Sequence, residues 1–439
     1  MEYFHQLAAA VQDMCSQKED FTLYYSAEES DFIRFNHAKI RQPGSVQQQN
    51  VVLRLIAAGK QVRSQFNLTG SFHDDIAKMT AVFQRLRARL QVVPVDPHLL
   101  INTEITSSTH IGATPSAPIE EMVDDIISGG KGLDMVGILA NGSITKGFAN
   151  SYGQRNWFQT NNFNYDWSFV ENADKAVKSS YAGTVWKQAE FLATVEEAKR
   201  KLEALQLPSI TLDPGEYRVI LSPGALWEIL GTVAWGGFGL KSQKTKISSL
   251  LKLVECEKRL SAKFSLFENI KDGASPNFQA DGFIRPDRIA LIEKGQHKNA
   301  LVSPRSAKEY DVATNGAGMG ESPAAIDVAA GDISYSDLRQ RLDTGIDISN
   351  LWYLNYSDRA NCGLTGMTRF ATLWIENGEI KGPINPMRFD DTIYRMLGEN
   401  LLGLTAERAF LLSASSYFER STQSARLPGA LIDNMRFTL

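Results

Sequence analysis

The sequence predicts an α+β protein of two domains, and three observations support this. At 439 residues the chain is too long for one ordinary hydrophobic core. Alternating apolar and polar residues, typical of strands, recur in both halves between segments with helix-capping residues. Pro208 and the run Asp213-Pro214-Gly215 break these patterns near the middle. We therefore expect an N-terminal α/β domain at 1–207 and a C-terminal domain at 215–439.

The first half is predicted to form a sheet with helices packed on it. A helix is expected to begin at Asp74-Asp75, whose carboxylates suit a helix N-terminus. Asn141-Gly142 is a favoured hairpin pair and predicts a turn between two short strands. The expected strands are 21–25, 31–40, 51–57, 62–68, 135–139 and 144–150, and the expected helices are 1–16, 74–92, 119–128 and 190–205.

The second half is predicted to open with a strand at 217–221 and a helix. Ser222 is a favoured N-cap and Pro223 suits the first helical position. Asn377-Gly378 predicts a hairpin between strands at 370–375 and 379–384. Asp390-Asp391 is expected to cap a further helix. Other expected elements are a helix or crossing segment at 246–256, a hairpin at 288–302, a short helix at 335–342 and a strand at 352–355.

Composition excludes several classes of protein. The chain has 46 Lys and Arg against 50 Asp and Glu, so it has no basic excess for nucleic-acid binding. Its three cysteines are too few and too far apart for a disulfide framework, which favours the cytoplasm. No run approaches the roughly 20 apolar residues of a membrane span. Glu2 and a short apolar run argue against a signal peptide.

Four sequence blocks together resemble the TldD/PmbA family of metalloproteases and DNA-gyrase modulators. They are SDFIRFNHAKIRQPG (30–44), YRVILSPGALWEILGTVAWGG (217–237), GAGMGESPAAIDVAAGDISYSDL (316–338) and RFATLWIENGEIKGPI (369–384). The resemblance implies a C-terminal domain of curved antiparallel sheet with helices. It also implies an HExxxH zinc motif, in the catalytic branch, on the helix that follows the 217–221 strand.

The zinc motif is missing from this chain. The positions that match its two histidines and its glutamate are Gly231, Gly236 and Thr232, and the C-terminal tail has no cysteine. The chain therefore resembles the metal-free PmbA/TldE-like branch, and we expect no cofactor. The resemblance implies a TldD-like catalytic paralogue as partner, or self-association as a dimer. It implies that the substrates are unfolded peptides or peptides undergoing maturation.

Two interpretations remain open for Trp235, Gly236 and the glycines that follow them. Glycine costs a helix roughly 1 kcal/mol, so the cluster is expected to end or distort the helix. It forms either a C-cap with close packing or, with Gly231 and Thr232, a vacated metal site that leaves a groove open. Gly318, Asp358 and Arg359 are further candidates for a peptide groove.

Structural roles are favoured over functional ones for the remaining candidates. Gly316, Gly318 and Gly320 lack a following P-loop lysine, so a flexible loop is expected rather than a phosphate cradle. Cys362 has no local base and is expected to be a small buried residue rather than a nucleophile.

Three functions follow from the sequence. The preferred one is a metal-free subunit that assists a TldD-type zinc protease. The second is a homodimeric, non-enzymatic peptide-binding or regulatory protein. The third is a standalone hydrolase with a different site, which needs convergent titratable groups that the sequence does not reveal. Zinc content separates the third from the others, and capture of a catalytic paralogue separates the first from the second.

Overall fold

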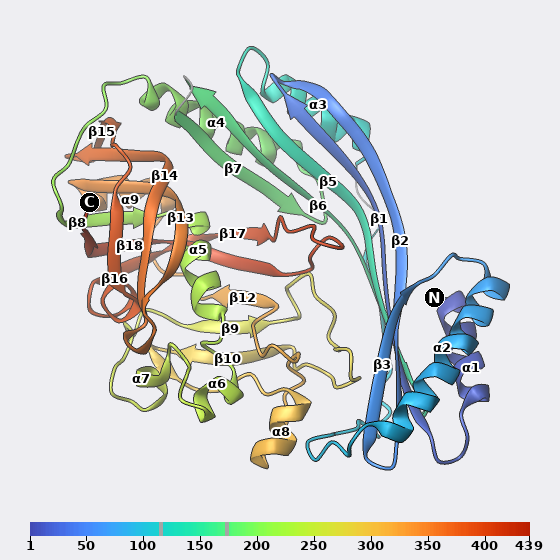
Figure 1. Cartoon of the computed structure of the whole chain (residues 1–439). Coiled ribbons are helices and arrows are strands. Elements are labelled where there is room, and N and C mark those ends of the chain that lie inside the picture. Colours follow the sequence, from blue (N-terminus) through green and yellow to red (C-terminus); the bar gives the residue numbers. More distant parts are fainter. Residues whose placement is uncertain (114–116, 172–174) are drawn as a thin grey trace.

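The computed structural model describes residues 1–113, 117–171 and 175–439 and confirms the α+β class (Figure 1). A long twisted sheet dominates the first half of the described chain, in the order β3-β2-β1-β5-β6-β4, with β7 paired to β6. Its strands are β1 (Asp20–Asn36), β2 (Lys39–Ala57), β3 (Lys60–Asn67), β4 (Ser108–Ile111), β5 (Met135–Asn150), β6 (Arg155–Glu171) and β7 (Lys175–Gly183).

Helices cover the outer side of this sheet, and its inner side faces the C-terminal half (Figure 1). Phe4, Leu7, Phe83 and Leu86 are buried where the first two helices pack on the strands. This apolar stripe is the one expected from the helical spacing. The helices of this half are α1 (Glu2–Met14), α2 (Phe72–Val92), α3 (Ile119–Gly129) and α4 (Gln188–Leu205).

The predicted turn at Asn141-Gly142 is wrong. Strand β5 runs through both residues and pairs with β1 on one side and β6 on the other. Gly142 has φ +148°, and an added Cβ would lie 2.1 Å from the Glu29 carbonyl oxygen. The glycine is therefore needed for close approach of two strands. The predicted strand 31–40 is also wrong, because β1 ends at Asn36 and the turn to β2 is His37-Ala38.

The predicted cap at Asp74-Asp75 is wrong as well. The N-cap of α2 is Ser71. Asp75 is buried, and its carboxylate accepts hydrogen bonds from the Thr69 and Gly70 N–H groups at 2.9–3.0 Å and from the Tyr3 hydroxyl. Asp75 thus ties α1 and the preceding loop to α2, instead of satisfying free N–H groups of the helix.

The C-terminal half is built on a mixed sheet that closes on itself. Strand β8 pairs with β13 and with β18, and β18 leads back through β16 and β14 to β13. The β8–β13 and β12–β18 pairs are parallel, whereas the sequence predicted antiparallel sheet. The strands are β8 (Gly215–Leu221), β9 (Leu266–Asn269), β10 (Arg288–Glu293), β11 (Gln296–His297), β12 (Ala325–Val328), β13 (Gly345–Asp358), β14 (Gly363–Glu376), β15 (Glu379–Pro383), β16 (Arg388–Thr392), β17 (Leu401–Leu412) and β18 (Ser424–Phe437).

Local signals predicted two elements of this half correctly. Helix α5 (Pro223–Ala234) begins after Ser222, whose hydroxyl accepts the Ala225 N–H. The hairpin between β14 and β15 turns at Asn377-Gly378, both with positive φ. Segment 246–256 holds only the short helix α7. The other helices are α6 (Leu240–Lys244), α7 (Leu251–Val254), α8 (Pro304–Tyr310), η1 (Tyr335–Asp337), α9 (Leu338–Leu342), η2 (Arg359–Asn361) and η3 (Arg395–Glu399).

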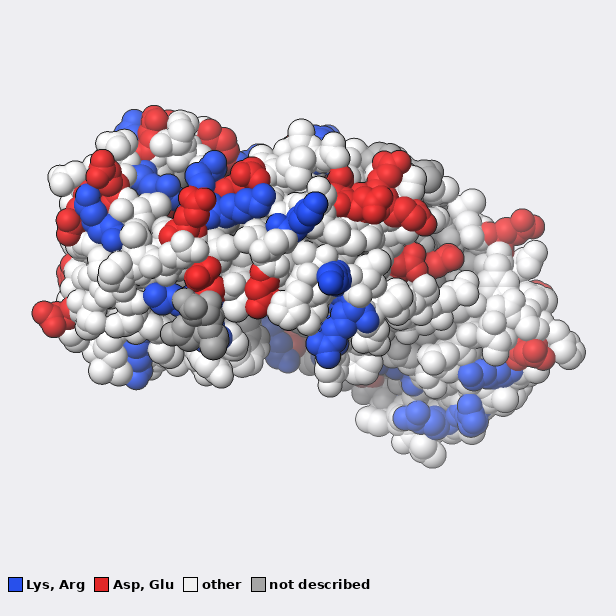
Figure 2. Space-filling model, turned by 90° about the horizontal axis from the view of Figure 1, so that it is seen from above, with Lys and Arg blue, Asp and Glu red and all other residues white. Residues whose placement is uncertain are grey.

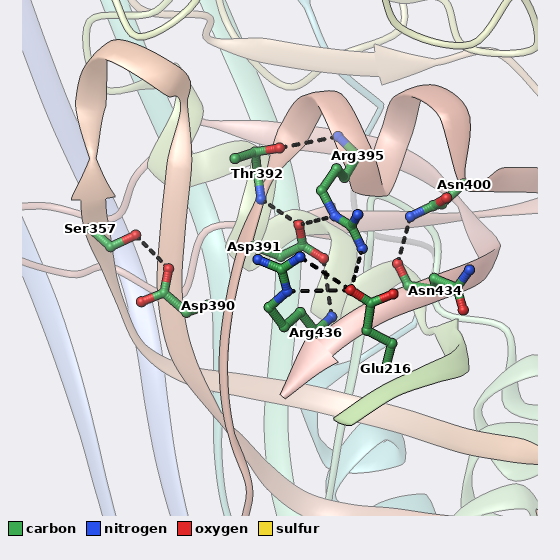
Figure 3. Close-up of polar contacts among 9 residues, drawn as sticks. All are labelled: Glu216, Ser357, Asp390, Asp391, Thr392, Arg395, Asn400, Asn434 and Arg436. Carbon is green, nitrogen blue, oxygen red and sulfur yellow. Dashed lines mark hydrogen bonds and ion pairs between the residues drawn. The ribbon is translucent and has the colours of Figure 1, made fainter. Parts of the chain in front are cut away.

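A helical segment follows at 393–399, as predicted, and the Thr392 hydroxyl accepts the Arg395 N–H at its start, at 3.2 Å. The predicted cap at Asp390-Asp391 is wrong (Figure 3). Both lie in strand β16. Asp391 is buried and accepts the Thr392 and Arg436 N–H groups, at 2.7 and 3.0 Å, and the Arg395 Nε at 3.0 Å. This carboxylate joins β16 to the end of β18, while Asp390 accepts the Ser357 hydroxyl and lies 3.7 Å from Arg388 Nη2 near the surface.

Segment 413–423, between β17 and β18, joins the two halves. The Glu419 carboxylate pairs with Lys146 of β5. The Arg420 guanidinium is buried against the inner side of the first sheet and donates to the Asn162 carbonyl at 3.0 Å. Burial lowers the pKa of Arg420 to about 10, against the opposing effect of Glu28. No helix in the described residues is long and apolar enough to cross a membrane.

We predict that Asp391→Asn destabilises the protein by about 3 kcal/mol, because it removes one partner of a buried ion pair. Asp390→Asn is the matched control and should cost less than about 1 kcal/mol. Urea unfolding of the two variants measures the difference. Equal small losses would show that the Asp391 network does not hold β16 to β18.

Gly142→Ala is predicted to destabilise the protein by about 1–3 kcal/mol, because the new methyl group meets a strand backbone at a strained φ. Gly44→Ala in β2 is the control, since its added Cβ meets no atom within 4 Å. Thermal unfolding of both variants tests this, and an unaffected Gly142→Ala protein would contradict the packing described above.

Candidate functional site

Helix α5 separates the core of the C-terminal half from a large cavity. Leu226, Ile229, Leu230 and Val233 on one face are buried in the core. The opposite face carries Trp227, Glu228, Gly231, Thr232 and Trp235, and all five line the cavity. These five recur at the spacing of one helical face. Gly231 and Thr232, the residues expected to match the zinc motif, therefore lie on the cavity side of the helix.

The cavity has a volume of about 860 Å³ and lies between the two halves of the molecule. Strands β6 and β7 and helix α4 line it from the first half, and α5, β13 and β17 line it from the second. Its volume falls in the range of ligand-binding sites in proteins. An added Cβ at Gly231 would meet no atom within 4 Å, so space is open in front of the helix.

Three charged groups meet in this cavity: Glu228 of α5, Asp166 of β6 and Lys178 of β7. Lys178 Nζ lies 3.4 Å from Asp166 Oδ2, and the other Asp166 oxygen is buried with no hydrogen-bond partner among the described residues. All three also line a second cavity of about 770 Å³. They therefore mark the place where the two cavities meet.

Desolvation within the cavity raises the pKa of Asp166 and of Glu228 above their ordinary values, although Glu228 keeps an exposed surface toward the cavity. For Glu228, nearby Asp166 acts in the same direction as burial, and Lys178 opposes it. The structure records no hydrogen bond or ion pair of the Glu228 carboxyl with the described residues. A carboxyl of this kind can hold a proton at a pH where an ordinary glutamate is ionised, or it can accept hydrogen bonds from a bound amine or amide.

Sequence reasoning missed this charged group. Glu228 could have been found, because it precedes Gly231 and Thr232 by three and four residues and so shares their helical face. Asp166 and Lys178 lie on neighbouring strands, opposite Ser180 and Ser168. Their approach depends on strand register, which the sequence does not reveal.

The two interpretations of the glycines, a closely packed helix end and an open groove, apply to different residues. Gly236 has φ +82° directly after the end of α5, and an added Cβ would lie 2.7 Å from Arg359 Nη2. Arg359 donates to the Trp235 carbonyl at 3.0 Å and to the Ile247 carbonyl at 3.0 Å. Gly236 thus serves a helix end with close packing, whereas Gly231 faces open space.

The other groove candidates are not brought together at this site. Asp358 accepts the Asn361 N–H at 3.1 Å and caps the short turn η2. Neither Asp358 nor Arg359 lines the α5 cavity, and Gly318 lies on a separate cavity of about 690 Å³. Cys362 is buried, as expected, and burial raises the pKa of its thiol to about 12.

A comparison with known families identifies the family to which the C-terminal half is similar. Residues 214–439 match the family model described as the PmbA/TldA metallopeptidase C-terminal domain. This chain belongs to the PmbA/TldD family. A comparison with curated proteins found no significant match.

Solved structures extend the family's fold to the full chain. TldE from Thermococcus kodakarensis superposes with a TM-score of 0.79 at 13% identity, covering 100% of both chains. Candidate DNA-gyrase modulators from Thermotoga maritima and Bacteroides thetaiotaomicron each match with a TM-score of 0.76 at 13% identity. The matches cover 100% of this chain and 99% and 98% of those chains, respectively. At this identity they establish the fold.

The residues at the family's metal position do not fit a metal ion. Gly231 and Gly236 have no side-chain donor, and the Thr232 hydroxyl donates to the Glu228 carbonyl at 3.0 Å. Within 1–113, 117–171 and 175–439, no three His, Cys, Asp or Glu side chains are grouped as a metal site requires. We derive no catalytic step through a metal held by this chain.

Glu228→Gln is predicted to raise the thermal midpoint at about pH 7.5. Because the pKa of Glu228 is raised in the folded state, this residue contributes to stability at pH values below its unfolded-state pKa. That contribution is lost as pH rises through the folded-state pKa, where the ionised group opposes folding. The gain from glutamine should therefore disappear as pH falls to about 4. Glu104→Gln, at an exposed loop position, is the control and should show no such dependence. A lower midpoint for Glu228→Gln at neutral pH would instead indicate a stabilising ion pair.

Proposed function

We propose that this chain is a metal-free, PmbA/TldE-like subunit of a TldD-type zinc metalloprotease complex. It assists the proteolysis or maturation of unfolded peptides and works in the cytoplasm. The observation that carries the proposal is the face of α5. That helix presents Gly231 and Thr232, at the family's zinc-motif positions, to a cavity of about 860 Å³. The scaffold of the site is kept while the groups that would hold zinc and activate water are replaced.

A free strand edge supports peptide binding at this cavity. Glu407, Arg408, Ala409, Leu411 and Leu412 of β17 line it. Along 408–411, β17 pairs with β18 on one edge, and no strand of the described chain pairs with the other edge. At the end of this run the Leu412 carbonyl accepts a hydrogen bond from Asn164 Nδ2 at 3.4 Å. An extended peptide can add to such an edge through main-chain hydrogen bonds, which demand little of its sequence. Glu228 and Asp166 then favour a peptide with an amine or a basic side chain at that point.

Exposed aromatic residues provide a surface for the partner subunit. Trp352 and Tyr353 of β13 are exposed, and the Arg369 guanidinium lies 4.1 Å from the Trp352 ring centre. Aromatic and arginine side chains are enriched in protein interfaces. We propose that this surface contacts a TldD-like catalytic paralogue, or a second copy of this chain when the paralogue is absent.

Mixing the chain with a TldD-type paralogue tests the proposal. The chain alone should hold no stoichiometric zinc and cleave no unfolded peptide, because Gly231, Gly236 and Thr232 supply neither the zinc ligands nor a general base. The mixture should elute as one complex and show chelator-sensitive cleavage. Zinc bound at one ion per chain, measured by elemental analysis, would contradict this function.

A cavity-filling variant tests the role of the α5 face. Gly231→Trp is predicted to keep the complex intact but to lower peptide cleavage at least about tenfold, because the indole occupies the open space. Gly231→Ala is the control and should cleave normally, since its methyl group meets no neighbour. The alternative, a homodimeric peptide-binding or regulatory protein, predicts peptide binding by the chain alone and no capture of a paralogue.

A further inference from the structure

The cavity that holds Gly318 is lined by an excess of basic side chains. It has a volume of about 690 Å³ and lies between β2, β3 and α2 on one side and residues 275–285 and α8 on the other. The face of the molecule in Figure 2 mixes acidic and basic side chains. The lining of this cavity contains one carboxylate, Asp281, and six Lys or Arg side chains, namely Arg54, Arg63, Arg89, Lys146, Arg285 and Arg305.

Half of these basic side chains form ion pairs. Arg54 pairs with Asp281, Lys146 pairs with Glu419, and Arg305 Nη1 lies 2.8 Å from Asp96 Oδ2. No ion pair of Arg63, Arg89 or Arg285 with the described residues is recorded, and Arg285 donates only to the Gly316 carbonyl at 3.3 Å. The cavity therefore keeps a positive charge after its internal pairs are counted.

Two of the arginines face each other across neighbouring strands. Arg54 of β2 is directly opposite Arg63 of β3 in the antiparallel register. Directly opposed residues point to the same face, and like charges in such a pair destabilise a sheet. Burial lowers the pKa of Arg54, and the charge of Arg63 lowers it further. A bound anion between the two guanidinium groups would remove this repulsion.

Buried donors on the same cavity lack acceptors. Arg54 is 8% exposed, and its Nε has no hydrogen-bond partner among the described residues. Gln279 is 5% exposed, and its Nε2 is also without a partner, while its amide oxygen accepts the Asp281 N–H. That bond fixes which end of the amide is the free donor. Buried donors of this kind are nearly always satisfied in native proteins.

We propose that this cavity binds a small molecule carrying two or more phosphate groups. Three guanidinium groups without an ion pair among the described residues match an anion with many acceptor oxygens and at least two charges. The volume suits a molecule of nucleotide size, and Tyr24 and Phe278 supply aromatic walls. This cavity shares no lining residue with the α5 cavity, so the proposal is independent of the peptidase function.

The glycine-rich segment contributes to this site in a different way from a phosphate loop. Residues 314–318 form no helix, so no helix N-terminus points at the ligand. Gly318 instead lies beside Arg285, whose Nη2 is 3.7 Å from the position of an added Cβ. The arginines supply the charge, and the glycine lies within ordinary van der Waals range of one of them.

Calorimetric titration of the full chain with ATP and with inorganic pyrophosphate tests the proposal, with citrate as a carboxylate control. ATP and pyrophosphate should bind and raise the thermal midpoint, and added salt should weaken both effects. Arg63→Gln and Arg89→Gln should each weaken binding at least about tenfold, through loss of a charge-assisted contact. Arg85→Gln is the matched control, since Arg85 is exposed on the same helix as Arg89 but lies outside the cavity lining.

Three outcomes would overturn the proposal. The first is no binding of either phosphate probe at millimolar concentration, which would leave water as the partner of the buried donors. The second is binding of citrate as tight as that of pyrophosphate and ATP. The third is an equal loss of binding in Arg85→Gln, which would indicate attraction by surface charge alone. Circular dichroism spectra of all three variants check that each is folded.

Discussion

The contact of segment 413–423 with the first sheet sets the spacing between the two halves, and all three cavities depend on that spacing. Lys146 pairs with Glu419, and the buried Arg420 is held by carbonyl and hydroxyl oxygens of the sheet. A buried charge left without partners costs several kcal/mol, so these contacts fix the segment firmly. The same segment supplies Thr422 to the basic cavity, Gln423 to the α5 cavity and Arg420 to the third.

Elements governed by short-range chemistry could be predicted from the sequence. Ser222 and Pro223 start α5, and Asn377-Gly378 forms its hairpin, because each depends on conformational preferences of two or three residues. The same rules failed at Asn141-Gly142, where pairing with two neighbouring strands outweighs the local turn preference. They failed at Asp390-Asp391, where the Asp391 carboxylate is used by the Arg395 side chain and by backbone N–H groups that include the one of Arg436, distant in sequence.

The charged parts of both cavities were harder to predict, because they are properties of the folded arrangement. Glu228 follows from helical periodicity, but Asp166 and Lys178 meet it only because β6 and β7 face α5 across the cavity. The formal charge of -4 for the whole chain gives no sign of the basic cavity. Its arginines come from β2, β3, α2, α8 and a loop, and a sum over the sequence averages them against acidic residues elsewhere.

Helix α5 keeps its folding and its chemistry on opposite faces. The leucine, isoleucine and valine side chains that hold it are all on the core side. The open side carries Glu228, Gly231, Thr232 and the exposed Trp235, which line the cavity. On such a helix, the residues of the cavity face can be exchanged for reactive groups without changing the residues that pack in the core. A non-catalytic subunit and a catalytic one can therefore share the same fold. This chain is a natural starting point for engineering a new metal centre.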